Sequence, residues 1–397
     1  AQADVLFEWL SGQRRCLRPG YQVCVMAEPV AKKAKVAEAQ DFIKGWPSPD
    51  LLTQPELKDA LTSSFKSFIG NTQMFLNYGD AQNGAYMLGT PVFRKTLAEF
   101  LSKQYGKTVD WNCIMSTGGS SMGTDISIRI HSAAGDYAVS EAPTYYLAHE
   151  MMRNRGLNLL EVPLQPDGMD LDALEKVLNG EHKGKIKLVY TVCVHHNPTG
   201  ITMCNAKRER LVKMAKQYDF KIIADEAYQL LNFAPSGVSS MFYHDDPANP
   251  RVLAIGTFSK LIGPGVKVGW VQAHPQILKP LISIGFIDSG NNPAIMSSGL
   301  LNEFIASGAL AKHIETVSKK LGAKKDLLVS ELKKIGLEPN DPKGGYFVWV
   351  KSKGKMTGRS GKGMSLNPPD AYADYMRLCF AWLSEEQIRE GVEFLKQ

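Results

Sequence analysis

Short runs of β-branched and apolar residues alternate with helix-like segments through the centre of this 397-residue chain. One of those segments, residues 205–218, places Leu211, Met214 and Ala215 on a single face, as an amphipathic helix does. This alternation is typical of an α/β domain built on a mainly parallel sheet. We therefore expect strands at residues 113–115, 137–140, 187–192, 221–224 and 252–255.

The pattern changes near Pro293. A long helix is expected over residues 310–335, because its apolar residues form one stripe with lysines opposite. We expect this helix to lead into a smaller C-terminal lobe, in which residues 345–350 form a strand. The expected organisation is an N-terminal segment that joins the small domain, a large domain and a small domain, over residues 1–50, 51–300 and 301–397.

Lys260 stands just beyond the apolar run of residues 252–256 and just before a glycine-rich loop. A lysine at the end of a buried strand can be desolvated, which makes its amine nucleophilic. Such an amine can form a Schiff base with an aldehyde cofactor. The sequence therefore directs attention to the other strand ends, where open α/β sheets bind their ligands.

Four other segments with polar side chains follow predicted strands. Residues 117–123 read Thr-Gly-Gly-Ser-Ser-Met-Gly, and their backbone N–H groups suit a phosphate, although a purely structural turn fits equally well. Asp225 can either keep a pyridine nitrogen protonated or cap a helix. Asn197, held by a Pro-Thr-Gly turn, can donate to a phenolate oxygen. Tyr145 can stack on an aromatic ring or pack on its own domain.

Taken together and in this order, the segments resemble those of fold-type I pyridoxal-phosphate enzymes, specifically the class I/II aminotransferases related to aspartate, kynurenine and 2-aminoadipate aminotransferases. The most specific elements are Asn-Pro-Thr-Gly at 197–200, Asp-Glu-Ala-Tyr at 225–228 and the Ser-Lys-x-x-x-Pro-Gly segment at 259–265. The resemblance runs from Asp41 to the C-terminus. It implies a large pyridoxal-phosphate-binding domain, with a mainly parallel central sheet flanked by helices, and a smaller α+β domain.

The resemblance implies a role for each matching residue. Lys260 would form the Schiff base with pyridoxal phosphate and then move the substrate α-proton. Asp225 would pair with the pyridine nitrogen, and Tyr145 would stack on the ring. Asn197 and Tyr228 would bond the phenolic oxygen.

Phosphate and substrate contacts follow from the same resemblance. The phosphate would be held by Ser120, Ser121, Thr257 and Lys267. Tyr78 matches a tyrosine that reaches the phosphate from a neighbouring subunit, which implies a homodimer. Arg377 would clamp the substrate α-carboxylate bidentately, as opposed to forming a surface ion pair. Gly45 and Trp46 would line the substrate site.

The chain departs from the family pattern in three places. Lys267 stands where arginine is usual, and an ammonium lacks the planar fork of a guanidinium. His195 and His196 precede Asn197, and adjacent residues at a strand end point to opposite sides, so we expect no shared metal ion. One of them would touch cofactor or substrate, or both would be hydrogen-bonded in the packing. Residues 351–363 are basic and glycine-rich, which predicts a solvated loop, with a lid over a charged substrate as the alternative.

The leading interpretation is an aminotransferase that moves an amino group between an L-amino acid and a 2-oxo acid. One alternative keeps the cofactor but changes the reaction to elimination, γ-substitution, decarboxylation or cyclisation. Another is a ligand-sensing domain of the kind fused to winged-helix regulators. Residues 1–40 are too few for a DNA-binding module, which counts against this alternative. The identity of the amino donor stays open.

Composition and charge bear on partners and location. The net charge of +6 comes from 46 basic and 40 acidic residues, so a nucleic-acid partner is not expected. The longest apolar runs, residues 188–194 and 281–287, are too short to span a bilayer. Six cysteines without a CxxC pair predict reduced thiols and a cytoplasmic location. Removal of a leader before Ala1 stays open.

Overall fold

The structure is a computed structural model, and it describes residues 42–70, 72, 76, 86–235 and 237–396. Residues 39–397 form one compact unit. No helix in these described ranges is long and apolar enough to cross a membrane. Tyr78 lies outside the described residues, as does most of the predicted N-terminal segment.

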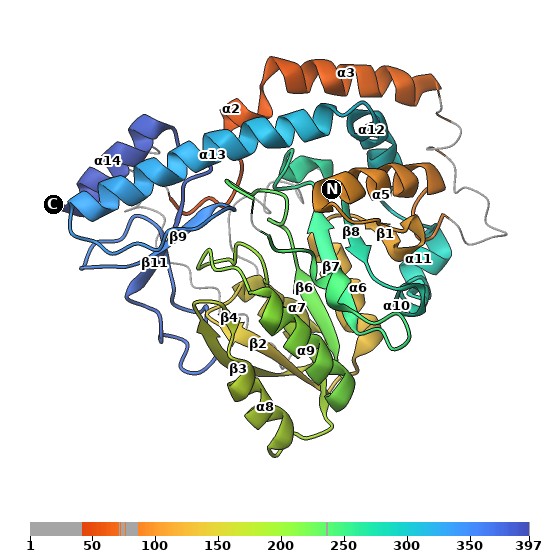
Figure 1. Ribbon diagram of the computed structural model, residues 1–397, viewed down its shortest axis with the longest axis horizontal. Helices are drawn as coiled ribbons and strands as arrows, with labels where there is room; N and C mark the ends of the chain where they lie inside the picture. Colours follow the sequence, from red (N-terminus) through yellow and green to blue (C-terminus); the bar gives the residue numbers. More distant parts are fainter. Residues whose placement is uncertain (1–41, 71, 73–75, 77–85, 236, 397) are drawn as a thin grey trace, which may run out of the picture. The chain divides into compact units, whose positions relative to one another are not determined.

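An eight-stranded sheet forms the centre of this unit, with the order β1-β8-β7-β6-β5-β2-β3-β4 (Figure 1). Strands β7, β6, β5, β2 and β3 run parallel to one another, whereas β8 is antiparallel to both β1 and β7, and β4 is antiparallel to β3. The mainly parallel sheet is therefore confirmed. The strands are β1 (Ile114–Thr117), β2 (Tyr137–Ala142), β3 (Asn158–Gln165), β4 (Gly168–Met169), β5 (Ile186–Thr191), β6 (Lys221–Asp225), β7 (Val252–Thr257) and β8 (Gly269–Gln272).

Both faces of the sheet are buried, which explains why its strands read as continuous apolar runs. In β6, Ile222 packs into one apolar cluster and Ile223 into another, and both side chains are fully buried. The first cluster includes side chains of α8 (Leu171–Asn179) and α9 (Asn205–Tyr218). The second includes side chains of α6 (Ser120–His131), α7 (Tyr146–Asn154) and α10 (Pro275–Leu281).

A smaller antiparallel sheet has the order β10-β11-β9, with β9 at Phe347–Lys351, β10 at Arg359–Ser360 and β11 at Tyr375–Cys379. The long helix α13 (Ala309–Lys334) agrees with the predicted helix to within one residue and packs against α14 (Glu385–Lys396) (Figure 1). The predicted domain division at residue 300 is not tested by these contacts and stays a prediction.

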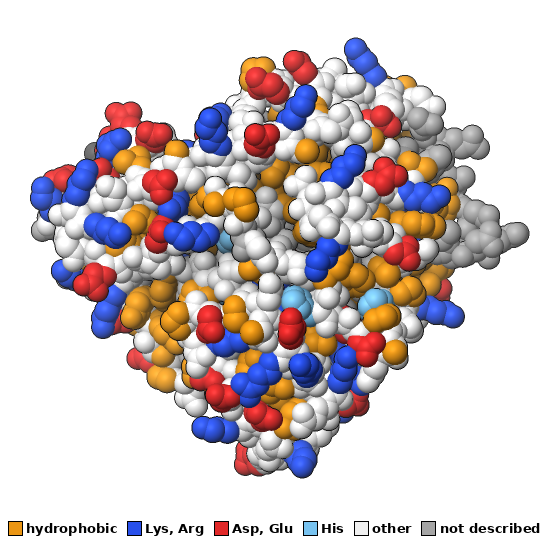
Figure 2. Space-filling model, viewed as in Figure 1, with side chains coloured by type: hydrophobic (Ala, Val, Ile, Leu, Met, Phe, Trp, Pro, Cys, Tyr) orange, Lys and Arg blue, Asp and Glu red, His pale blue; other side chains and the backbone are white. Residues whose placement is uncertain are grey.

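The remaining helices surround this framework. Helix α3 packs against α12 and α13, and α5 packs against α12. Acidic and basic side chains are interspersed over the face shown in Figure 2. The helices are α2 (Pro49–Leu52), α3 (Pro55–Gly70), α5 (Pro91–Tyr105), α11 (Gly285–Gly290) and α12 (Ile295–Ala306), with 3₁₀ turns at Trp111–Cys113, Met241–His244 and Pro264–Val266.

Candidate active site

A cavity of about 290 Å³ lies beyond the carboxyl ends of the parallel strands. Parallel strands end at the same edge of a sheet, so segments far apart in the sequence meet there. Ten of the predicted site residues line the cavity: Gly45, Trp46, Ser120, Ser121, Tyr145, Asn197, Asp225, Tyr228, Lys260 and Arg377. The residues that the sequence placed at the strand ends therefore do line one cavity.

Lys260 enters the cavity from the turn that follows β7. Its Nζ donates a hydrogen bond to the Gly45 carbonyl at 2.8 Å, and its backbone carbonyl accepts one from the Tyr346 hydroxyl at 2.6 Å. Burial lowers the pKa of Lys260, and the positive charge of Arg377 acts in the same direction. A buried amine with a lowered pKa is the form that can act as a nucleophile and as a base.

Asp225 is the last residue of β6, and its carboxylate is held from two sides. Oδ2 accepts a hydrogen bond from the Tyr190 hydroxyl at 2.9 Å, and Oδ1 accepts one from the Ala227 N–H at 3.1 Å. Burial raises the pKa of Asp225, while these two bonds and the nearby charge of Lys260 oppose that rise. No helix begins at Asp225, so the capping alternative is wrong.

Tyr190 is a site-supporting residue that the sequence analysis missed. It lies in the interior of β5, is fully buried, and stands beside Ile223 of β6 in the register of the sheet. A tyrosine directly after the aliphatic residues Leu188 and Val189, one strand away from a predicted site carboxylate, was the available signal. Its partner could not be named without the strand register.

Asn197 and Arg377 are hydrogen-bonded to each other in the cavity wall. The Arg377 Nη1 donates to Asn197 Oδ1 at 3.0 Å, and Nη2 donates to the Ile43 carbonyl at 2.8 Å. Because the amide oxygen of Asn197 is occupied, its NH₂ group remains as the donor for an oxygen in the cavity. Arg377 also lies over the Phe347 ring, with 4.3 Å between the guanidinium carbon and the ring centre.

Arg377 is not a surface residue, since only 6% of it is exposed. Burial lowers its pKa. Its Nε–H has no hydrogen-bond partner among the described residues, so the guanidinium retains a free donor. The surface ion-pair alternative is therefore wrong, and the side chain is available to an anionic ligand.

The glycine-rich segment after β1 opens a helix, as predicted. Strand β1 ends at Thr117 and α6 begins at Ser120, with Gly119 as its N-cap at φ 93°, a value that favours glycine. A side chain at Gly269 would come within 2.9 Å of the Gly119 backbone, which shows how closely β8 supports this loop. The Ser120 and Ser121 side chains line the cavity at the helix N-terminus, where backbone N–H groups and the helix dipole favour an anion.

Two predicted phosphate ligands do not line the cavity. Thr257 is buried, and its hydroxyl is engaged with Ser259 and with the Val268 carbonyl, at 3.0 Å and 3.4 Å. Lys267 is exposed and adopts a left-handed backbone conformation, with φ at 49°. Their role as phosphate ligands stays a prediction.

His195 and His196 point to different surroundings, and neither lines the cavity. The His195 Nε2 is 2.8 Å from Asn232 Oδ1. The His196 Nδ1 accepts from Thr199, and its Nε2 lies 3.2 Å from the buried Glu141 carboxylate. The structure therefore supports hydrogen-bonded packing for both histidines. Within the described ranges, no group of three or more His, Cys, Asp or Glu side chains could hold a metal ion.

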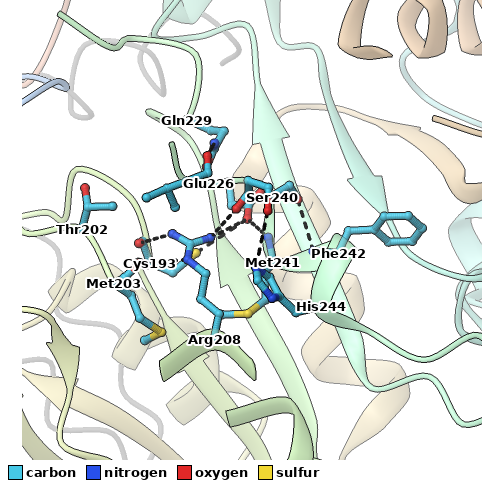
Figure 3. Close-up of polar contacts among 12 residues, drawn as sticks. Cys193, Thr202, Met203, Arg208, Glu226, Gln229, Ser240, Met241, Phe242 and His244 are labelled. Atoms are coloured by element: carbon cyan, nitrogen blue, oxygen red, sulfur yellow. Dashed lines mark hydrogen bonds and ion pairs between the residues drawn. The ribbon is translucent and has the colours of Figure 1, made fainter. Parts of the chain in front are cut away.

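Glu226, the neighbour of Asp225, belongs to a buried polar network outside the cavity (Figure 3). Its Oε1 accepts from the Met241 N–H at 2.6 Å and lies 3.8 Å from Nη1 of Arg208. Arg208 is fully buried and donates to three backbone carbonyls, those of Cys193, Met203 and Ser239. This network anchors the turn that follows β6 and, with it, the position of Asp225.

Arg359 is a second missed residue, and it lies in the basic stretch 351–363, most of which is exposed as expected of a solvated loop. It belongs to β10 and lines the cavity. Thr357 in the same stretch is buried, and Gly361 packs so closely that a side chain there would lie 2.7 Å from the Trp349 ring. The middle of the stretch is therefore anchored and brings a cation to the cavity, while a role of the stretch as a lid stays a prediction.

Comparisons with known proteins agree on one family. A family model described as aminotransferase class I and II matches residues 50–395. An aromatic-amino-acid aminotransferase of Thermococcus litoralis is 29% identical over 392 residues, which are 94% of this chain and 91% of that protein. The crystal structure of a multiple substrate aminotransferase from Thermococcus profundus superposes with a TM-score of 0.80 at 27% identity, over 94% of each chain. That of an α-aminoadipate aminotransferase from Thermus thermophilus, complexed with N-(5'-phosphopyridoxyl)-L-leucine, gives 0.76 at 25% identity over 90% of this chain and 91% of that one.

Proposed function

This chain belongs to the class I and II aminotransferase family, and from that premise we propose that the cavity at Lys260 is the site of its reaction. The protein is a fold-type I, pyridoxal-phosphate-dependent transaminase that moves an amino group between an amino acid and a 2-oxo acid. The single observation that carries the site assignment is the meeting of Lys260, Asp225 and Arg377 at one cavity. Asp225 ends β6, Lys260 lies in the turn after β7, and Arg377 stands in the middle of β11 in the smaller sheet.

The side chains of the cavity fit pyridoxal phosphate. Asp225 is a buried carboxylate suited to a protonated pyridine nitrogen, and the NH₂ group of Asn197 is a free donor for the phenolic oxygen. The N-terminus of α6 with Ser120 and Ser121 suits the phosphate. When bound, pyridoxal phosphate supplies an aldehyde carbon and a ring that withdraws electrons from the amino acid's α-carbon.

Different residues of this chain would then bind the cofactor and move the proton. Lys260 would hold pyridoxal phosphate through its amine, and the same amine would carry the proton that leaves and rejoins the substrate. Asp225 keeps the proton on the pyridine nitrogen, helped by the hydrogen bond from Tyr190. Tyr145 offers a ring face to the cofactor. Thr257 and Lys267 extend the proposed phosphate contacts beyond the cavity wall.

Arg377 is proposed to bind the substrate α-carboxylate. Its guanidinium is fixed by Asn197 and the Ile43 carbonyl, while Nε–H has no hydrogen-bond partner in the part of the chain that the structure describes. A buried arginine with a free donor binds a carboxylate strongly, because both partners lack competing water. Gly45 and Trp46 lie beside it in the cavity wall and limit where the substrate can lie.

We also propose a homodimer. Apolar side chains are exposed on α3, α11 and α12, namely Phe65, Ile69, Phe286 and Met296. Leu147 is exposed as well and lines the cavity, which places apolar surface at its rim. Surface of this kind is typical of an interface between subunits. Tyr78 would reach the neighbouring phosphate site across that interface.

A half-reaction tests the proposed site and chemistry together. The cofactor-loaded protein, given an L-amino acid without an acceptor, should release one equivalent of 2-oxo acid per subunit and stop until a second 2-oxo acid is added. The Lys260→Ala variant should release almost none, while Lys279→Ala, on α10 away from the cavity lining, should behave like the parent. Release of ammonia or of a side-chain fragment in place of the 2-oxo acid would overturn the proposal.

A further inference from the structure

Strand β9 begins beside two residues of the proposed reaction site. Its first residue, Phe347, packs against Arg377, with 4.3 Å between the ring centre and the guanidinium carbon. The residue before it, Tyr346, donates a hydrogen bond from its hydroxyl to the backbone carbonyl of Lys260 at 2.6 Å. Two consecutive residues therefore contact the arginine proposed to hold the substrate and the lysine proposed to move its proton.

The Tyr346 side chain is fully buried and packed among other aromatic rings. Its ring centre lies 5.4 Å from that of Tyr228, which lines the cavity, and 6.2 Å from that of Phe347. The Lys260 Nζ lies 5.8 Å from the Tyr346 ring centre. Burial raises the pKa of Tyr346 above its ordinary value, so the hydroxyl keeps its proton and remains a donor in the neutral range. The Lys260 carbonyl is therefore held by a donor with little freedom to move.

The backbone that presents Tyr346 is bound to another part of the site. The Gly345 N–H donates to the Leu231 carbonyl at 2.9 Å. The Phe233 N–H donates to the Lys343 carbonyl, also at 2.9 Å. Gly345 has φ at 74°, a conformation that favours glycine. Since Leu231 and Phe233 belong to the stretch that follows β6, the start of β9 is fixed to the edge of the large sheet where the cavity lies.

The turn that carries Lys260 receives a second hydrogen bond from the C-terminal part of the chain. The Nε2 of His313, on α13, lies 3.0 Å from the Leu261 carbonyl, and it donates there because a carbonyl oxygen only accepts. Within the turn, the Leu261 N–H donates to the Phe258 carbonyl at 3.1 Å. The bond from Tyr346 differs from these because it acts on the carbonyl of Lys260 itself.

Proton transfer depends on where the Lys260 amine lies relative to Arg377. A carboxylate held by the arginine fixes the substrate α-carbon, and the amine must lie within hydrogen-bond reach of the proton that it takes. A displacement of about 1 Å can cost about 100-fold in rate. Arg377 has its own hydrogen bonds to Asn197 and Ile43, which do not involve Tyr346. Loss of the Tyr346 bond should therefore move the lysine and leave the arginine in place.

We propose that Tyr346 is a positioning residue for the transamination: its hydroxyl fixes the main chain at Lys260, so that the start of β9 sets the spacing between Lys260 and Arg377. This inference rests on the proposed function and adds a residue to it. Tyr346 is not part of the cavity lining, and it acts on the reaction through Lys260.

The test compares Tyr346→Phe with the parent, using an L-amino acid and its α-deuterated form as donors. The variant should lower kcat by about 5- to 10-fold, as for the loss of one buried hydrogen bond, and change KM by less than about twofold. The isotope effect on kcat should be at least as large as in the parent, because the loss falls on transfer of the α-proton. Tyr375→Phe, on β11 of the same small sheet and stacked on Trp349, is the matched control and should reproduce the parent's kcat, KM and isotope effect.

Hydrogen exchange gives a readout that needs no turnover. In the protein without substrate, the amides of residues 257–262 should exchange about 5- to 10-fold faster in Tyr346→Phe than in the parent, while those of α9 should not change. Equal exchange at residues 257–262, faster exchange that extends to α9, an unchanged kcat, a KM that rises as much as kcat falls, or a smaller isotope effect would each overturn the inference. Failure of the proposed function would appear differently, as absent 2-oxo acid release from the parent, while the exchange rates would still report on the bond from Tyr346.

Discussion

Lys260 illustrates how burial sets the chemistry of a single residue. Its amine lies in the cavity wall, hydrogen-bonded to the Gly45 carbonyl, and desolvation disfavours its charged form. Arg377 adds electrostatic repulsion, whereas Asp225 acts in the opposite direction. The balance leaves a lysine whose pKa lies below its ordinary value of 10.5.

A pH dependence follows from this lowered pKa. The rate at which the protein captures pyridoxal phosphate should rise with pH and reach half of its maximum below pH 10.5, because only the neutral amine reacts. Arg377→Gln removes a charge that lowers the pKa of Lys260, so its half-maximum should move to higher pH. Stopped-flow absorbance measurements across the pH range check this. A midpoint that stays in place, or moves to lower pH, would contradict the account.

Tyr190 gives a second prediction at the same scale. Tyr190→Phe removes the hydrogen bond to Asp225 Oδ2 and keeps the packing, so it should raise the pKa of Asp225. The carboxylate then holds the cofactor less firmly. A lost hydrogen bond to a charged group is worth about 1.5–3 kcal/mol, so the Kd for pyridoxal phosphate should rise by about 10- to 100-fold. Fluorescence titration of the cofactor-free protein measures it. Tyr137→Phe, a partly exposed tyrosine at the far end of β2, is the control, and equal Kd values for Tyr190→Phe and the parent would remove Tyr190 from the site.

At the scale of elements, the turn after β6 depends on the buried network of Arg208 and Glu226 (Figure 3). Burial raises the pKa of Glu226, and Arg208 opposes that rise. A carboxyl whose folded-state pKa exceeds its unfolded-state pKa binds more protons when the protein is folded. Its contribution to stability therefore falls as the pH rises from the unfolded-state pKa to the folded-state pKa. Removal of Arg208 should raise the folded-state pKa of Glu226 further, which widens the pH range over which stability falls.

Arg208→Met should therefore destabilise the protein more at pH 7 than at pH 4.5. The loss at neutral pH should be about 3–5 kcal/mol, as for other buried charges left without a partner. The double variant Arg208→Met/Glu226→Gln should lose much of the pH dependence. Urea denaturation at several pH values measures both proteins. A loss in Arg208→Met that does not change with pH would show that Glu226 does not depend on Arg208.

Elements with a strong local pattern were predictable from the sequence. Helix α9 was predicted with its observed ends, and the strand ends that carry Asn197, Asp225 and Lys260 were found because buried parallel strands are short apolar runs. Strand β8 was missed, since its antiparallel pairing depends on a long-range contact in which Trp270 lies against Gly256. Strand β3 was missed because Glu161 and Pro163 interrupt its apolar pattern.

The sequence did not predict two side chains at the site, Tyr190 and Arg359, and the physical reason is the same for both. Tyr190 reaches Asp225 only through the register of β5 and β6, and Arg359 reaches the cavity only because a two-residue strand pairs with β11. Register between strands depends on tertiary contacts, so it cannot be predicted from single residues in the sequence. By contrast, the segments at the carboxyl ends of β1, β5, β6 and β7 were expected from the sequence to lie at one edge of the sheet, and residues of all four line the cavity.

At the scale of the whole molecule, the exposed apolar side chains on α3 bear on assembly. A Phe65→Lys/Ile69→Lys variant should dissociate the proposed homodimer, because two buried charges would be placed in an apolar interface. Sedimentation equilibrium should then report the mass of one subunit. Met356→Lys, an exposed apolar residue in the 351–363 stretch, is the control and should leave the mass unchanged. A double variant with the parent's mass would remove α3 from the interface.

The central claim is that Lys260 is the residue that binds pyridoxal phosphate covalently. The measurement is borohydride reduction of the cofactor-loaded protein, followed by proteolysis and mass spectrometry of the peptides. We expect one modified peptide, with the phosphopyridoxyl group on Lys260, and no modification in Lys260→Ala. Modification of a different lysine in the parent protein, or a modified peptide that persists in Lys260→Ala, would contradict it.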